Sequence, residues 1–189
     1  MTTVLVTGGG QRLDEVSSAV KATGAEVVVV DTLDRLGESV SGQTFDAYVQ
    51  LPVAMTPPEG SLVSKVEQFL TQGLLSRFRA AATVLPTLAP SATVILVSGQ
   101  TNVDVDAPDD REARVALMRV LAHALRAERA PERLTVRTVD HTWSAEQIAA
   151  KVTDRSGADA SSASGGDEGI GQAYADWRAE VVGLMRVEF

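Results

Sequence analysis

The sequence contains no cysteine, which excludes disulfide bonds, thiolate metal sites and a cysteine nucleophile. Basic residues are also few: 17 lysines and arginines stand against 25 aspartates and glutamates, giving a net charge of -8. Because nucleic-acid binding needs a basic surface, we expect no nucleic-acid partner. The longest apolar runs fall far short of the roughly 20 residues that cross a bilayer, so we expect no membrane span.

We also expect no secretory signal. Residues 1–10 lack a basic segment followed by a long apolar stretch. We therefore expect a soluble, cytoplasmic protein. With 189 residues and 44% hydrophobic content, the chain can bury one substantial core, which predicts a single domain.

Short apolar runs alternate with segments of helical periodicity along most of the chain. Strands that are apolar on both faces must be covered on both sides, which is typical of a parallel sheet. The sequence therefore predicts a Rossmann-like, doubly wound α/β fold with three layers. We expect strands at Thr3–Thr7, Glu26–Asp31, Phe45–Leu51, Thr93–Ser98 and Leu134–Val139, and helices at Asp14–Thr23, Ser61–Leu85, Asp110–Glu128 and Ala145–Val152.

The composition changes near residue 154. Residues 154–169 are small and polar, with no large apolar side chain, so they favour a flexible linker. Residues 170–189 carry apolar residues such as Trp177 and Val181, which favour an amphipathic helix. The predicted organisation is a Rossmann-like domain over residues 1–153, a linker and a helical segment. That segment could dock on its own core or on another subunit.

The loop after the first strand has the composition of a phosphate-binding turn. Gly8 and Gly10 permit positive φ, and the backbone amides that follow can approach a phosphate at a helix N-terminus. Thr7 ends the strand before this turn. Asp31 ends the second strand, where a carboxylate can accept hydrogen bonds from the ribose of a dinucleotide. These residues predict a nucleotide site that suits NAD better than NADP.

Two residues weaken this interpretation. A complete dinucleotide fingerprint has further glycines where this chain has Arg12 and Asp14. Arg12 could pair with a phosphate, but Asp14 adds negative charge near a ligand that is already negative. A tight turn kept for the fold is the simpler explanation.

The order of four segments resembles the short-chain dehydrogenase/reductase family. They read VLVTGGG, GAEVVVVD, LTQGLLSRFRAAATVLPTL and TVILVSG, and the likeness covers about residues 3–152. The resemblance implies a nicotinamide cofactor, proton transfer by a tyrosine with a neighbouring lysine, and association through the two long helices. It places the catalytic serine at Ser98.

The other catalytic positions of the family carry different residues. The tyrosine is expected at Arg111 and the lysine at Val115, and nowhere in the chain is a tyrosine followed by a lysine four positions on. The helical asparagine that anchors a proton-relay water falls at about Gly73. Arginine stays protonated at neutral pH and is a poor proton-transfer group, while valine offers neither charge nor hydrogen bond. Ser98 alone is then more simply a strand-end residue.

The mobile lid of the family is also missing. Residues 138–141 run almost directly into residues 144–149, which resemble the helix that normally follows the lid. His141, with Asp140 and Ser98, could compose a nucleophile-base-acid set, but the chain has no nucleophile elbow. The acidic residues between 104 and 110 lack the turn glycine and final glutamate of a calcium loop, so we expect no metal.

The leading interpretation is a non-catalytic, structural or regulatory subunit that resembles a short-chain dehydrogenase. We expect it to pair with itself or with an active relative, and to bind NAD(H) or NADP(H) weakly or not at all. An NAD(P)-dependent oxidoreductase with an atypical active site and a dinucleotide-binding sensor remain as alternatives.

Overall fold

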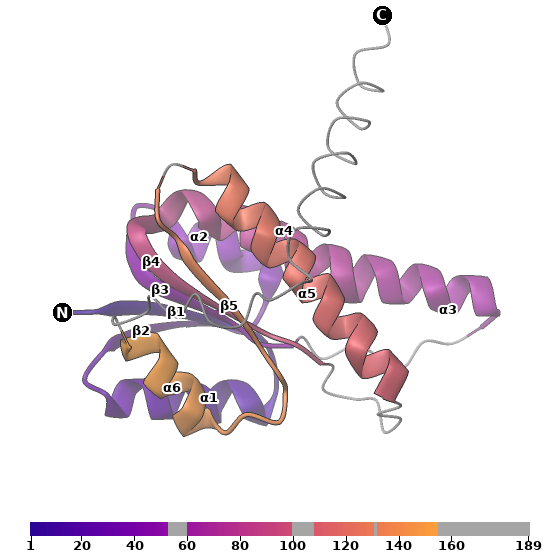
Figure 1. Ribbon diagram of the computed structural model, residues 1–189, viewed down its shortest axis with the longest axis horizontal. Helices are drawn as coiled ribbons and strands as arrows, with labels where there is room; N and C mark the ends of the chain where they lie inside the picture. Colours follow the sequence, from indigo (N-terminus) through magenta and orange to yellow (C-terminus); the bar gives the residue numbers. More distant parts are fainter. Residues whose placement is uncertain (53–59, 100–107, 131, 155–189) are drawn as a thin grey trace, which may run out of the picture.

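The computed structural model describes residues 1–52, 60–99, 108–130 and 132–154. They form a sheet of five parallel strands in the order β2-β1-β3-β4-β5 (Figure 1). This arrangement confirms the predicted Rossmann-like α/β fold. The strands are β1 (Thr3–Thr7), β2 (Glu26–Val30), β3 (Phe45–Gln50), β4 (Leu88–Val97) and β5 (Thr135–Val139).

Helices cover both faces of the sheet (Figure 1). One face packs against α1 (Gln11–Ala22) and α6 (Ala145–Thr153), which also contact each other. The opposite face packs against three helices, which are α2 (Leu36–Val40), α4 (Ser76–Val84) and α5 (Pro108–Glu128). A short α3 (Leu62–Gln68) continues α4 through a π-helical segment, Phe69–Leu75, and extends beyond the sheet.

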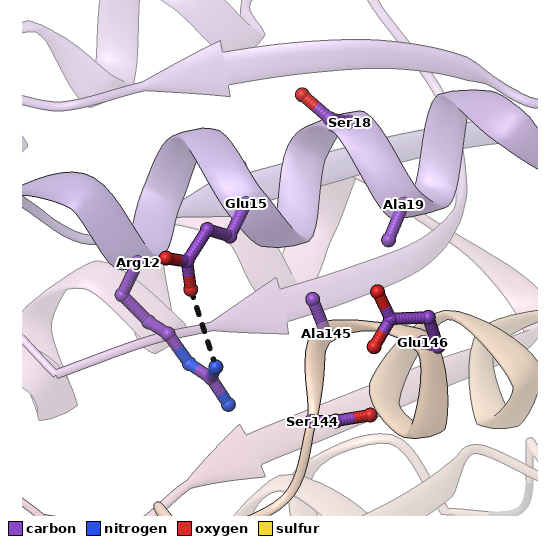
Figure 2. A pocket seen from close by; sticks show the side chains of 7 residues that line it. All are labelled: Arg12, Glu15, Ser18, Ala19, Ser144, Ala145 and Glu146. Carbon is purple, nitrogen blue, oxygen red and sulfur yellow. Dashed lines mark hydrogen bonds and ion pairs between the residues drawn. The ribbon is translucent and has the colours of Figure 1, made fainter.

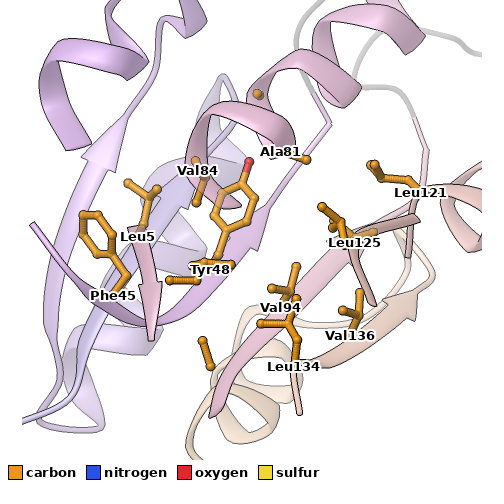
Figure 3. Packing of buried hydrophobic residues seen from close by; sticks show 14 of the residues in the cluster. Leu5, Phe45, Tyr48, Ala81, Val84, Val94, Leu121, Leu125, Leu134 and Val136 are labelled. Atoms are coloured by element: carbon orange, nitrogen blue, oxygen red, sulfur yellow. The ribbon is translucent and has the colours of Figure 1, made fainter. Parts of the chain in front are cut away.

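The larger core cluster lies between the sheet and the α2–α4–α5 layer (Figure 3). Its centre is Tyr48 on β3, with Leu5 and Phe45 on one side and Val84 of α4 above. Each large side chain buried this fully contributes roughly 1.5–3 kcal/mol to folding. The cluster therefore fixes α4 over the carboxyl half of β3.

Several element boundaries differ from the prediction. α1 begins at Gln11 instead of Asp14, because Gly10 serves as its N-cap. β4 begins at Leu88, well before Thr93, and its pairing with β3 shifts register between Phe45 and Ala47. The predicted linker and C-terminal helix span residues 154–189; Asp154 is described and caps α6, and residues 155–189 lie outside the described residues.

The helix α2 was not predicted. Leu36 and Val40, four positions apart, are buried against α4 and the core, while the residues between them are more exposed. This spacing is a helical signal, but five residues are too few to stand out against the surrounding polar loop.

The connection between β5 and α6 is short, as predicted, and consists of residues 140–144. Ser144 caps α6 through a reciprocal pair of bonds: its Oγ accepts from the Gln147 amide at 3.2 Å, and Gln147 Oε1 accepts from the Ser144 amide at 2.7 Å. Such a capping box satisfies two amide donors of the first turn. Across the described residues, every helix is too short or too polar to cross a membrane.

Candidate functional site

The sheet topology places the candidate site at the carboxyl ends of β1 and β3. From β1 the chain crosses by α1 to β2 on one side, and from β3 it crosses by α4, on the other face, to β4. The direction in which successive strands are added to the sheet therefore reverses between β1 and β3, although all the strands are parallel. In open α/β sheets, ligands bind in the crevice outside the strand ends at this switch point.

The glycine turn lies at this switch point. Gly8 has φ +151° and Gly10 has φ +69°, and Gly10 is the N-cap of α1 without a side-chain cap. The first amides of α1 point along the helix axis toward its N-terminal end, which is a favourable place for an anion. Gly8 also packs on the chain after β3, because a Cβ there would lie 2.5 Å from Leu51 Cβ.

Asp31 follows β2 directly and is exposed, with its Oδ1 accepting from Thr32 Oγ1 at 3.1 Å. The Gly8 amide donates to Val30 O at 3.4 Å, which joins the glycine turn to the end of β2. The structure thus brings Thr7, Gly8 and Asp31 to one edge of the sheet.

Arg12 extends from the first turn of α1 toward the connection between β5 and α6 (Figure 2). Its guanidinium donates to the carbonyl oxygen of Trp143 and lies 3.5 Å from a carboxylate oxygen of Glu15. It lines a shallow groove of about 360 Å³ between α1 and the start of α6. The proposed contact between Arg12 and a phosphate would require the side chain to leave these partners.

A buried polar network lies at the ends of β1 and β3. Thr7 Oγ1 and Tyr48 Oη are 3.0 Å apart, and Gln50 Nε2 donates to Tyr48 Oη at 3.1 Å. The same Nε2 donates to the main-chain oxygen of Arg77 at 2.9 Å. Burial raises the pKa of Tyr48, although hydrogen bonds from Thr7 and Gln50 oppose that rise.

Arg77 of α4 completes this network. Its side chain is 6% exposed, and its Nε donates to Gln50 Oε1 at 3.1 Å. Its Nη2 donates to Gln50 O at 3.4 Å and to Val97 O at 2.6 Å. One side chain therefore ties α4 to the last residues of β3 and β4. Burial lowers the pKa of Arg77 to about 10, so the guanidinium stays charged at neutral pH.

Sequence reasoning missed this network. The available signal was the placement of polar residues at core positions, since Gln50 ends an apolar strand and Arg77 lies on the helical face that also carries Ala80, Ala81 and Val84. Buried polar side chains need partners, so their positions predict a network but not which residues pair.

We expect Tyr48→Phe to lower the free energy of unfolding by about 1–3 kcal/mol, because Thr7 Oγ1 loses its hydrogen bond to Tyr48 Oη inside the core. Since the folded-state pKa of Tyr48 is raised, its contribution is present below pH 10 and is lost as pH rises through that higher pKa. The difference between wild type and variant should therefore shrink above pH 10. Urea unfolding at neutral and alkaline pH measures it.

The matched control is Thr7→Val, which removes the other side of the same hydrogen bond. In a double-mutant cycle the two changes should couple by roughly 1 kcal/mol, as neighbours in one network do. Fully additive effects would show that the Thr7–Tyr48 contact contributes nothing to stability.

Ser98 lies at the carboxyl end of β4 and is 1% exposed. Its amide donates to Val139 O at 2.8 Å, which extends the β4–β5 pairing by one residue. His141 packs directly on Gly99, where a Cβ would lie 2.7 Å from His141 Cβ, and its Nδ1 is 3.4 Å from Asp140 Oδ1. The structure thus brings Ser98, Asp140 and His141 to one corner of the carboxyl edge.

Comparison of the sequence with models of known families and with curated proteins finds no match. Solved structures do match the fold. A double variant of a short-chain dehydrogenase/reductase from Serratia marcescens superposes with a TM-score of 0.56 and 16% identity, over 80% of this chain and 87% of that chain. The chain has the fold of the short-chain dehydrogenase/reductases.

Two further structures share this fold. The protein lin1944 from Listeria innocua has a TM-score of 0.53 and 18% identity, over 79% of this chain and 91% of that chain. A Burkholderia multivorans protein assigned to the short-chain dehydrogenases, with bound NADP, has a TM-score of 0.52 and 15% identity, over 71% and 76%. At these identities the similarity establishes the architecture.

The positions expected for the family's catalytic residues fall on described helices. Gly73 lies within the π-helical segment, a local widening that often occurs at functional sites. Val115 is half-buried on α5. Arg111 lies in the first part of the same helix, where the structure describes the backbone but not the side chain.

Proposed function

We propose that this chain is a non-catalytic subunit with the short-chain dehydrogenase fold, structural or regulatory in role, that pairs with itself or with a catalytically active relative. The observation that carries the proposal is that the chain keeps the fold but lacks the tyrosine and lysine that the family uses for proton transfer. The glycine turn and Ser98 remain at the carboxyl edge, while the whole sequence has no tyrosine followed by lysine four positions on. The 140–144 connection also leaves little chain for a lid over a substrate.

The helix layer that extends beyond the sheet supports assembly. Val63 on α3 is 75% exposed, and Leu75 at the end of the π-helical segment is 43% exposed. Leu74 and Phe78, in contrast, are half-buried against the core. Apolar side chains exposed on a protruding helix are costly in water and mark interaction surfaces when they gather. A closed two-fold interface would cover them.

The apolar residues Met118 and Leu121 of α5 do not belong to an exposed contact surface. Met118 and Leu121 are 3% exposed and belong to the core, so a substitution there would test folding instead of assembly. The assembly surface is therefore assigned to Val63 and Leu75.

We expect the wild-type chain to associate at tens of micromolar, and Val63→Glu with Leu75→Glu to weaken that association, because each substitution places a charge on an apolar contact. Light scattering measures the mass of each sample, and circular dichroism checks that the fold is kept. The control is Val29→Glu on β2, which adds one glutamate on another element at a residue whose exposure, 40%, is close to that of Leu75, 43%, so it is compared with Leu75→Glu alone.

The hetero-oligomeric form is tested by co-purification from the native source, followed by mass spectrometry. Recovery of an active short-chain dehydrogenase that the double variant fails to retain supports a subunit role. A wild type that stays monomeric at tens of micromolar and recruits no partner would remove the basis for this proposal.

A second candidate function is a dinucleotide-binding sensor or an oxidoreductase with an atypical site. It is favoured by the convergence of Thr7, Gly8, Gly10 and Asp31 at the switch point. Arg12, bonded to Trp143 and Glu15, offers this site little help. Titration with NADH and NADPH distinguishes the subunit, for which we expect weak binding or none, from the sensor, which must bind the dinucleotide. A turnover assay then distinguishes the sensor from an oxidoreductase.

A further inference from the structure

The two outer strands of the sheet differ in how their free edges are protected. Among the described strands, β2 and β5 each pair with one neighbour. The edge of β5 carries charged groups: Arg126 donates to the carbonyl oxygen of Val136, and Arg137 Nη1 lies 3.8 Å from Asp154 Oδ2. Charged side chains at an edge keep another strand from pairing with it.

The free edge of β2 is apolar, since the strand consists of one glutamate followed by four valines. The Glu26 amide donates to Thr2 O at 2.9 Å, and Val30 O accepts from the glycine turn at 3.4 Å, so the even-numbered residues of β2 bond on the β1 side. Because the backbone groups of successive strand residues point to opposite edges, Val27 and Val29 direct their amides and carbonyls away from β1. Within the part of the chain that the structure describes, these four groups have no hydrogen-bond partner.

The side chains at this edge are open to solvent. Val29 is 40% exposed, and Val27 is half-buried against the core cluster under α1. Both lie on the α1 side of the sheet, because strand residues two positions apart share a face. An added strand would cover Val29 and give the four free backbone groups their partners. The edge of β2 therefore has the properties of a site for strand addition.

The charges beside β2 favour a basic partner over a second copy of this chain. Glu26 begins the strand and Asp31 directly follows it; both are exposed, and among the described residues neither has a salt bridge. Antiparallel pairing of two β2 strands would bring Glu26 of each copy beside Asp31 of the other, and like charges on neighbouring strands are destabilising. Each copy also carries a net charge of -8, which adds to the repulsion.

We propose that the free edge of β2 binds an extended segment of another polypeptide, which adds to the sheet as a further strand and carries basic residues at both ends. The backbone of that segment pairs with Val27 and Val29, and its basic ends face Glu26 and Asp31. This inference goes beyond the proposed subunit role, because it uses a different element from the helical surface assigned to assembly, and either can fail without the other.

The probe is the synthetic peptide KKVTVTVKK, titrated into the full ¹⁵N-labelled chain. In the free protein we expect the Val27 and Val29 amides to exchange quickly with solvent, and the Val28 amide, which faces β1, to exchange slowly. A peptide concentration of about ten times its Kd should slow exchange at Val27 and Val29 roughly tenfold. The peptide EEVTVTVEE controls for charge and should not bind, because its glutamates meet Glu26 and Asp31.

Two N-methylated forms of the basic peptide are matched to each other. A strand directs alternate amides to opposite edges, so methylation of its valine amides and methylation of its threonine amides block different edges. Only one edge of the peptide faces β2, so one form should lose affinity by at least about tenfold and the other should keep it. Equal binding by both forms, or no binding by the unmethylated peptide, would overturn the proposal.

Val29→Pro removes the outward amide and leaves the pairing with β1, because proline is tolerated on an edge strand where its missing N–H faces solvent. It should weaken peptide binding about fivefold to tenfold, whereas Val29→Thr keeps the amide and the branched shape and should bind like the wild type. Equal affinities of the two variants would contradict strand addition. If Val29→Pro does not fold, the methylated peptides decide the question with the wild type. Strong protection of the Val27 and Val29 amides in the free protein would assign the edge to a second copy if it rises with protein concentration, or to this same chain if it does not, and either result would overturn the proposal.

Discussion

Gly8→Ala should lower the free energy of unfolding by about 3–5 kcal/mol, a large part of the roughly 5–15 kcal/mol that stabilises an ordinary domain. The new Cβ would lie 2.5 Å from Leu51 Cβ and 3.4 Å from both Leu51 Cα and Pro52 O. Leu51 is fully buried, so it has little room to move. The φ of +151° adds backbone strain of about 1–3 kcal/mol for any residue with a side chain.

The matched control is Gly10→Ala in the same turn. Gly10 also has positive φ, +69°, but nothing lies within 4 Å of the Cβ that alanine would add. We therefore expect a smaller loss of about 1–3 kcal/mol, the cost of placing a side chain in a backbone conformation (φ 69°, ψ -168°) that is almost confined to glycine. Urea unfolding of the two variants measures the difference. Equal losses would mean that Leu51 does not pack on Gly8 as described.

The second large expected effect is the absence of hydride transfer. We expect the purified chain to reduce carbonyl compounds with NADH or NADPH at a rate indistinguishable from background. Positioned general acid/base groups contribute roughly 10² to 10⁴-fold to such reactions, and the positions expected for them carry Arg111 and Val115. The measurement follows the absorbance of the reduced nicotinamide with a panel of ketones and aldehydes.

Restoring the pair by Arg111→Tyr and Val115→Lys should not produce turnover, because the short 140–144 connection cannot close over a substrate. An active short-chain dehydrogenase assayed beside it controls for the quality of the reagents. Robust turnover by the unmodified chain that is lost in Ser98→Ala would favour the oxidoreductase interpretation over the subunit.

The sequence predicts the architecture well because each buried strand carries its own signal. The apolar run from Thr3 to Thr7 and the one from Phe45 match the observed β1 and β3 closely. The predicted ends of the strands are less accurate where contacts between distant segments determine where a strand begins. β4 extends back to Leu88 although Pro90 lies within it, because pairing of Leu88 with Phe45 continues the sheet across an irregular register.

The candidate site is less predictable than the fold. The glycine turn and Asp31 follow from local spacing, and the structure places both at the switch point. Arg12 has a suitable position along α1, yet its guanidinium binds Trp143, a residue far along the chain. The Gln50–Arg77 pairing likewise depends on how α4 lies over β3. The spacing of residues along a helix predicts only the face of the helix on which a side chain lies. The partner that the side chain reaches depends on how the helices pack on the sheet.

The parallel sheet also sets the order in which this chain can fold. Ala47 pairs with Val4 on one side and with Thr93 on the other, so the central strands join segments that are distant along the chain. No strand pair is a local hairpin among the described strands, and each pairing must close a long loop before it gains any contact. Such topologies fold slowly compared with helical proteins of similar size. During synthesis β1 must therefore remain unpaired on its β3 side until β3, which ends at Gln50, has emerged, and this exposes an apolar strand to aggregation for that time.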